Sequence, residues 1–140
     1  MKISARNVLA GKIQSITRGA VNAEVTLILQ GGETVTSIIT NGSVDSLELK
    51  EGQPAYAVIK ASEVMIGKGV EGVKLSARNQ LAGKVTKLQA GMVSCEVVIE
   101  LPSGTAVVAS ITRDGATELG LKDGDMVSAI VKASSVLIGV

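Results

Sequence analysis

Apolar and polar residues alternate along two stretches of the chain, residues 21–29 and 93–101. Successive side chains of a β-strand point to opposite faces, so this alternation predicts strands with one buried face. Turn-forming residues follow at 30–33 and 102–104, which predicts hairpins leading into second strands at 34–40 and 105–112. The next strands are predicted at 55–60 and 125–132.

Helical spacing of apolar residues occurs only in two short segments, 43–49 and 114–121. Val44 and Leu47 lie three residues apart in the first, as do Ala116 and Leu119 in the second. Each segment ends at a glycine-containing turn, 50–52 or 122–124, which is a common helix stop. The sequence therefore predicts one short helix between the second pair of strands in each half of the chain.

The two halves of the chain are copies of one unit. Residues 3–67 align without a gap with residues 75–139, and 28 of the aligned pairs are identical. We therefore predict a first domain at 1–67, a linker at 68–74 and a second domain at 75–140. About five strands and one helix per copy indicate an all-β fold of two tandem five-stranded Greek-key barrels with an OB-like (oligonucleotide/oligosaccharide-binding) shape.

Composition excludes most catalytic and nucleic-acid functions. The chain has 140 residues with no His, Trp or Phe and one Cys, so Ser-His-Asp, Cys-His and His- or Cys-rich zinc chemistry have no residues to use, and we do not expect an enzyme. A net charge of +1 and 1% aromatic residues leave neither a broad basic surface for phosphates nor aromatic rings for base stacking, the usual contributions to nucleic-acid binding. The single Cys95, on an apolar strand face, is expected to be an inert core thiol.

We further expect a cytoplasmic protein with no membrane segment, because the thiol is unpaired, no basic-then-apolar leader precedes the first repeat and no long apolar run occurs. A barrel of about 65 residues without Phe or Trp has a thin core, so burial between the copies or between chains is predicted. An oligomer follows from this expectation.

Polar residues retained in both copies are the candidates for function. Ser-Ala-Arg-Asn stands at 4–7 and 76–79, Lys-Ala-Ser at 60–62 and 132–134, and Thr40 matches Thr112. Hydroxyls, a guanidinium, an ammonium and turning backbone N–H groups are suited to a small tetrahedral dianion. No carboxylate cluster is present for a bare metal cation. The alternative is that these residues are turn hydroxyls and solvated charges at strand ends.

Glu24 and Glu96 are also retained, and they alternate with apolar residues. An exposed strand face or an ion pair between chains explains them better than catalysis does.

The repeated motifs resemble the molybdate-binding Mop domain family. The resemblance rests on Met-Lys-Ile-Ser-Ala-Arg-Asn at 1–7, Gly-Ala-Val-Asn-Ala-Glu-Val at 19–25 and Ala-Val-Ile-Lys-Ala-Ser at 57–62, in a tandem duplication like that of two-domain molbindins. It implies OB-related barrels assembled as a homotrimer with several oxyanion sites. It also implies no catalytic cofactor, molybdate or tungstate as ligand, and no nucleic-acid or membrane partner.

Carried over by motif, one class of molybdate site lies between chains. It would use, in the two copies, Ser4, Ala5, Arg6, Lys60, Ala61 and Ser62 with Thr40, and Ser76, Ala77, Arg78, Lys132, Ala133 and Ser134 with Thr112. A second, axial class would involve Val21 and Asn22, and Val93 and Ser94, where Ser94 replaces the asparagine of the motif.

The resemblance thus implies intracellular storage or homeostasis of molybdate. The alternative in a different class is a molybdate-sensing regulatory module, because domains similar to this one occur as appendages of transcription factors and importer ATPases. This chain has neither a DNA-binding helix pair nor a nucleotide-binding loop, so it would act through a protein partner. An oligonucleotide-binding barrel is a third interpretation, which the missing aromatic residues oppose.

Overall fold

A computed structural model describes residues 1–140 as ten strands and two short α-helices. The first half contains β1 (Asn7–Arg18), β2 (Asn22–Leu29), β3 (Thr34–Thr40), α1 (Asn41–Ser46), β4 (Pro54–Ile59), the 3-10 turn η1 (Ala61–Glu63) and β5 (Met65–Gly67). The second half contains β6 (Asn79–Ala90), β7 (Ser94–Glu100), β8 (Ala106–Thr112), α2 (Arg113–Leu119), β9 (Met126–Val131), the 3-10 turn η2 (Ala133–Ser135) and β10 (Leu137–Gly139). Neither helix is long and apolar enough to cross a membrane.

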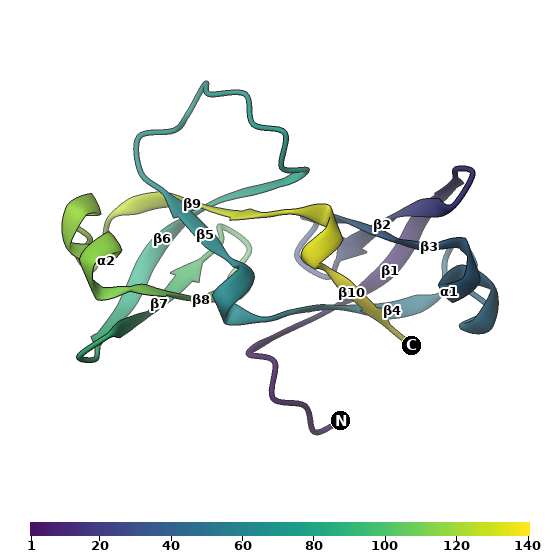
Figure 1. The fold of residues 1–140 in the computed structure, drawn as a ribbon, viewed down its shortest axis with the longest axis horizontal. Coiled ribbons are helices and arrows are strands. Elements are labelled where there is room, and N and C mark those ends of the chain that lie inside the picture. Colours follow the sequence, from purple (N-terminus) through teal and green to yellow (C-terminus); the bar gives the residue numbers. More distant parts are fainter.

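The strands form two antiparallel five-stranded sheets, one at each end of an elongated molecule (Figure 1). The first sheet has the order β10-β4-β1-β2-β3, and the second has the order β5-β9-β6-β7-β8. In each sheet the two edge strands also contact one another, β3 with β10 and β8 with β5. The predicted fold class, two tandem five-stranded OB-like units with one short helix each, is confirmed.

The fifth strand of each sheet comes from the other repeat. Residues 65–67 of β5 pair with β9, and residues 137–139 of β10 pair with β4. The sequence predicted about five strands per copy, and the structure places the fifth strand of each copy in the sheet of the other repeat. Because the two copies offer equivalent edges, exchanging equivalent strands retains the same type of pairing while tying the repeats together. Each sheet therefore depends on both halves of the chain.

The exchange joins two thin cores into one. A single cluster of 26 buried apolar residues includes members from both repeats. Examples are Val25 and Leu27 in β2 and Val97 and Ile99 in β7, which are all completely buried. Cys95 is buried in this cluster as expected. Burial between the copies, which the small size of each repeat predicted, is thus supplied within one chain.

Strand β1 pairs with two neighbouring strands, β2 and β4. Its pairing with β2 shifts register between Ile13 and Ser15, and β6 has the same irregularity with β7 between Val85 and Lys87. A Cβ atom on Gly11 would lie 2.4 Å from the backbone oxygen of Ile28. Only glycine permits this close approach between β1 and β2.

Two buried asparagines fasten the outer edges of the sheets to the opposite repeat. Asn79 Nδ2 donates to the Thr36 carbonyl on β3 at 2.8 Å, and Asn79 Oδ1 accepts from the Thr36 N–H at 2.8 Å. Asn7 makes the same pair with Val108 on β8, at 2.8 and 2.7 Å. Each side-chain amide therefore forms hydrogen bonds with the backbone N–H and carbonyl of an edge-strand residue, as a neighbouring strand would.

The linker is attached to the second repeat by Lys68. Its Nζ lies 3.0 Å from Asp125 Oδ2 and also donates to the carbonyls of Leu119 and Gly120. Hydrogen bonds from Lys68 and from the Lys122 N–H hold the pKa of the Asp125 carboxyl below its usual value of 3.8. A carboxyl whose pKa is lowered by folding stabilises the folded state above its unfolded pKa, and loses that contribution as the pH falls through the folded pKa.

We therefore expect Lys68→Met to lower the free energy of unfolding at pH 7, and to lower it progressively less as the pH falls through the lowered pKa of the Asp125 carboxyl. Urea unfolding of both proteins at a series of pH values from 7 downwards measures this. A residual difference at low pH is expected because the carbonyls of Leu119 and Gly120 do not titrate. A loss of stability in Lys68→Met that grows as the pH falls would contradict a stabilising ion pair between Lys68 and Asp125.

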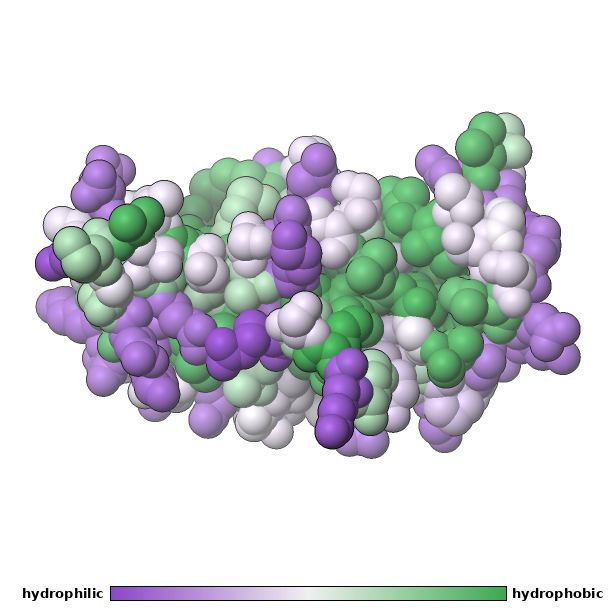
Figure 2. Space-filling model, turned by 60° about the horizontal axis from the view of Figure 1, so that its bottom comes forward, coloured by the Kyte–Doolittle hydropathy of each residue, from purple (hydrophilic) through white to green (hydrophobic).

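Apolar side chains remain on the surface. In one face of the molecule they gather around the middle and over the end formed by the first sheet (Figure 2). The exposed large apolar residues include Ile3, Tyr56, Met65, Leu75, Met126 and Leu137. Patches of this kind mark interaction surfaces in many proteins.

Candidate functional site

The retained motifs converge in two equivalent pockets beside the exchanged strands. The pocket of about 580 Å³ that contains the first set of motifs is called the first pocket, and its lining includes Ser4, Ala5, Arg6, Lys60, Ala61 and Ser62. The pocket of about 600 Å³ that contains the second set is called the second pocket, and its lining includes Ser76, Ala77, Arg78, Lys132, Ala133 and Ser134. Twelve of the fourteen residues expected for the first class of site are thus brought together in two groups of six.

Local structure explains how each Lys-Ala-Ser motif contributes. Strand β9 ends at Val131, Lys132 remains extended, and the chain then turns into η2, with the Ser135 N–H donating to the Lys132 carbonyl at 2.9 Å. The first N–H groups of such a turn have no partner within it. Ala133 and Ser134 therefore bring backbone donors as well as a hydroxyl to the second pocket, and η1 does the same in the first.

The opposite wall of each pocket is the segment that leads into β1 or β6. Asn7 and Asn79, at the start of these strands, are 1% and 3% exposed and are fixed to the opposite repeat by the edge hydrogen bonds described above. This anchoring places Ser-Ala-Arg directly before β1 opposite Lys60, and the same residues before β6 opposite Lys132. The asparagines were noted in the sequence only as retained polar residues, and their anchoring role was missed.

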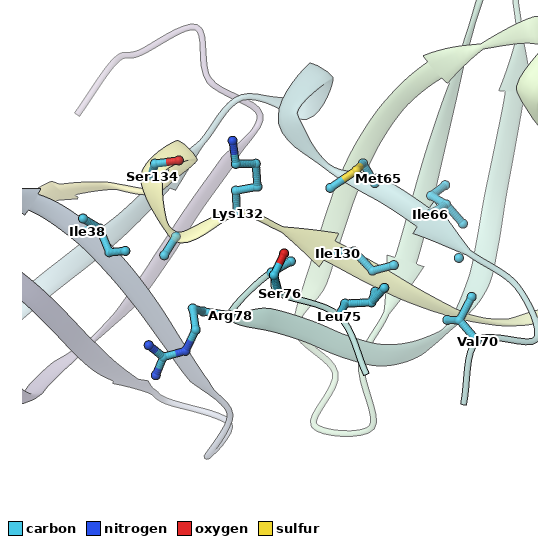
Figure 3. Close-up of a pocket in the computed structure, with 13 residues that line it drawn as sticks. Ile38, Met65, Ile66, Val70, Leu75, Ser76, Arg78, Ile130, Lys132 and Ser134 are labelled. Atoms are coloured by element: carbon cyan, nitrogen blue, oxygen red, sulfur yellow. The ribbon is translucent and has the colours of Figure 1, made fainter. Parts of the chain in front are cut away.

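The arginines of both pockets are paired with glutamates of the other repeat. Arg78 Nη1 lies 2.7 Å from Glu24 Oε2, and Arg6 binds Glu96 through both guanidinium nitrogens at 2.9 and 3.2 Å. Hydrogen bonding to Glu24, together with the charge of that carboxylate, raises the pKa of Arg78 above its usual value. Figure 3 shows the Arg78 guanidinium turned away from Lys132. These ion pairs form within one chain, whereas the sequence predicted an exposed strand face or an ion pair between chains for the two glutamates.

Thr40 and Thr112 do not line either pocket. Each is the N-cap of a helix, where its Oγ1 accepts a hydrogen bond at 3.0 Å from the N–H of Ser43 or Gly115. Within one chain these threonines are therefore separate from the Arg and Lys residues with which they were expected to act. The capping explains locally why both copies place threonine at this position.

The four residues of the axial candidate also lie in two separate places. Val21 and Asn22 are beside α1, and Val93 and Ser94 are beside α2, at opposite ends of the molecule (Figure 1). Val21 is 71% and Val93 is 81% exposed. Asn22 pairs with Thr40, and Ser94 pairs with Thr112, in the β2–β3 and β7–β8 ladders. The axial candidates are thus next to the capping threonines and not next to the pockets.

Chemically, each pocket offers a compact set of donors. Each lining includes one lysine, one arginine, the two serines of its motifs and backbone N–H groups beside an apolar wall. The first pocket also includes Glu63, Ser134 and Ser135. Such a set matches a small oxyanion, since charge-assisted hydrogen bonds are the strong ones and an apolar wall limits competition from water. Nowhere do three or more His, Cys, Asp or Glu side chains gather in a way that could hold a metal cation.

Comparison with solved structures identifies a close structural relative. The cytoplasmic molybdate-binding protein ModG, solved with molybdate bound, superimposes with a TM-score of 0.97 at 44% sequence identity, and the match covers 100% of this chain and 99% of that chain. The similarity therefore includes both repeats and their relative arrangement.

Curated relatives are similar along the whole chain. The molybdenum transport protein ModE of Herbaspirillum seropedicae is 39% identical over 140 residues, and the molybdenum-pterin-binding protein MopA of Rhodobacter capsulatus is 38% identical over 138 residues. These matches cover 100% and 99% of this chain but 52% of each relative, so the chain spans about half of their length. A model of the TOBE domain matches twice, at residues 3–66 and 75–138. With two matches that together span nearly the whole sequence, the chain belongs to the TOBE domain family.

Proposed function

We propose that this protein binds molybdate, and that the first and second pockets are its principal sites. The observation that carries the proposal is that Lys132 and two serines line one pocket together with Arg78, and that Lys60, Arg6 and the equivalent serines line the other. The similarity over the full chain to a protein solved with molybdate supports the choice of anion.

Binding rests on charge-assisted hydrogen bonds and on exclusion of water by the apolar wall. Lys132 and the η2 donors face the anion from one side, and Ser76 comes from the other (Figure 3). Tungstate has the same charge and nearly the same size, so it is the natural second ligand. The protein performs no chemistry on the anion and serves in cytoplasmic storage and homeostasis of molybdenum.

Self-association completes the sites in this proposal. Exposed apolar residues such as Met65, Leu75 and Leu137 lie in the pocket walls, where contact with another chain would cover them. Thr40 and Thr112 lie outside the pockets of their own chain, which leaves them available to the pockets of a neighbour. We expect a homotrimer, with Val21, Asn22, Val93 and Ser94 near its axis as further oxyanion ligands.

A second candidate function is molybdate sensing through a protein partner. It is favoured by the match to about half of a longer molybdenum transport protein, in which this kind of unit is combined with other sequence. Retention of a specific protein by the molybdate-loaded form, and not by the ligand-free form, would favour sensing over storage.

The proposed function is tested by equilibrium binding of molybdate with sulfate and phosphate as competitors, on protein whose solution mass is measured with and without ligand. We expect micromolar or tighter binding by an oligomer, resistant to an excess of sulfate. A folded protein that binds no molybdate would overturn the proposal.

A further inference from the structure

The two pockets differ at one charged position. Glu63 in the first repeat corresponds to Ser135 in the second, and these equivalent residues meet where η1 approaches η2, with Ser135 Oγ donating to Glu63 Oε2 at 3.1 Å. Both residues line the first pocket. The second pocket contains neither of them and has no carboxylate in its lining.

The balance of charge therefore differs between the pockets. In the second pocket, Arg78 and Lys132 are opposed by one carboxylate, Glu24, which is bound to the arginine. In the first, Arg6 and Lys60 are opposed by two carboxylates, Glu96 on the arginine and Glu63 in the pocket wall. The second pocket keeps one excess positive charge, whereas the first is neutral.

The walls of the pockets differ in the same direction. Val70 of the linker and Ile38 of β3 add apolar surface to the second pocket, together with Ile66 and Ile130. The first pocket has Val58 in the place of Ile130, and its lining contains the polar contact between Glu63 and Ser135. Electrostatic attraction acts more strongly where apolar groups displace water. The excess positive charge of the second pocket is therefore also less screened by solvent than the charges of the first pocket.

Building on the proposed function, we propose that Glu63 makes the two oxyanion sites unequal, so that the second pocket fills first and the first pocket binds the same dianion more weakly. The carboxylate of Glu63 repels a dianion held by Lys60 and Arg6, and no such group acts at Lys132 and Arg78. For an exposed carboxylate at the edge of a site, screened by solvent and salt, we expect a difference in affinity of about tenfold.

The test is a molybdate titration followed by calorimetry on the full chain, with Glu63→Gln and Glu63→Ser. Glu118→Gln removes the same charge from an exposed position on α2, outside both pockets, and is the matched control. Wild type is expected to show a tight and a weaker class of sites, with Lys132→Ala removing the tight class and Lys60→Ala the weaker one. Glu63→Gln should bring the weaker class to within about threefold of the tight class.

The double variant Glu63→Ser/Ser135→Glu provides a second readout, because both positions line the first pocket and the carboxylate therefore stays in it. In that protein we expect two unequal classes of sites, with Lys132→Ala still removing the tight class, in contrast to the nearly equal classes of Glu63→Ser. A weaker class in Glu63→Gln that is unchanged from Glu118→Gln would overturn the role of Glu63 while leaving molybdate binding intact. Absence of molybdate binding in wild type would overturn both this inference and the proposed function.

Discussion

Replacing Asn79 with alanine is expected to lower the free energy of unfolding by about 3 kcal/mol, one of the two largest effects predicted for a single substitution. The amide is 3% exposed and makes two hydrogen bonds of 2.8 Å with the N–H and carbonyl of Thr36. Alanine would leave both backbone groups buried without a partner, and an unsatisfied buried donor or acceptor is costly. Urea unfolding followed by circular dichroism measures the loss.

The neighbouring exposed residue Gln80 provides the control, since Gln80→Ala removes an amide of similar chemistry from the same strand without a buried partner. Asn79→Asp should destabilise at least as much as alanine, because a carboxylate cannot donate to the Thr36 carbonyl. Asn7→Ala should behave like Asn79→Ala, because it releases Val108 in the same way. Equal stabilities of Asn79→Ala and Gln80→Ala would contradict the anchoring role of the asparagine.

The second large effect concerns binding. Lys132→Ala is expected to weaken molybdate binding at the second pocket by about 10- to 100-fold while leaving the fold intact. The side chain is exposed, makes no ion pair in the chain, and contributes the only charged donor of the η2 side of the pocket. Removing it deletes one charge-assisted interaction without exposing a buried partner.

Arg78→Ala is the less direct test of the same site, because it also frees Glu24. Lys84→Ala is the matched control, since Lys84 is an exposed lysine retained in both repeats and lies in neither pocket. Binding is measured by calorimetry, and circular dichroism with solution mass checks the fold and assembly. Molybdate affinity that is the same in Lys132→Ala and Lys84→Ala would show that the second pocket is not the site.

The strand positions were largely predictable from the sequence. The sequence predicted strands at 34–40, after a hairpin turn, and at 55–60, and the structure has β3 at Thr34–Thr40 and β4 at Pro54–Ile59. The helices begin one or two residues earlier than their apolar spacing indicated, because Thr40 and Thr112 cap them. Hydroxyl caps act through the first turn, which apolar periodicity does not report.

The composition of the candidate site was also predictable in part. Repetition of Ser-Ala-Arg and Lys-Ala-Ser singled out twelve residues that the structure gathers in two pockets. Their pairing with Glu24 and Glu96 across the repeats was not predictable, although retention of both glutamates was the available signal. The contribution of Thr40 and Thr112 stays a prediction that involves a neighbouring chain.

The sequence by itself determined the class of fold, the duplication and the chemistry of the retained residues, because alternation, turns and repeated motifs are local properties. Only the tertiary structure decided which edge each fifth strand joins, which backbone Asn7 and Asn79 bind, and that Glu63 faces the first pocket. Two copies of one unit present nearly equivalent edges and partners, so local sequence signals favour pairing within a repeat and pairing across repeats equally. The choice between them depends on contacts between residues far apart in the chain, which exist only once both halves have packed together.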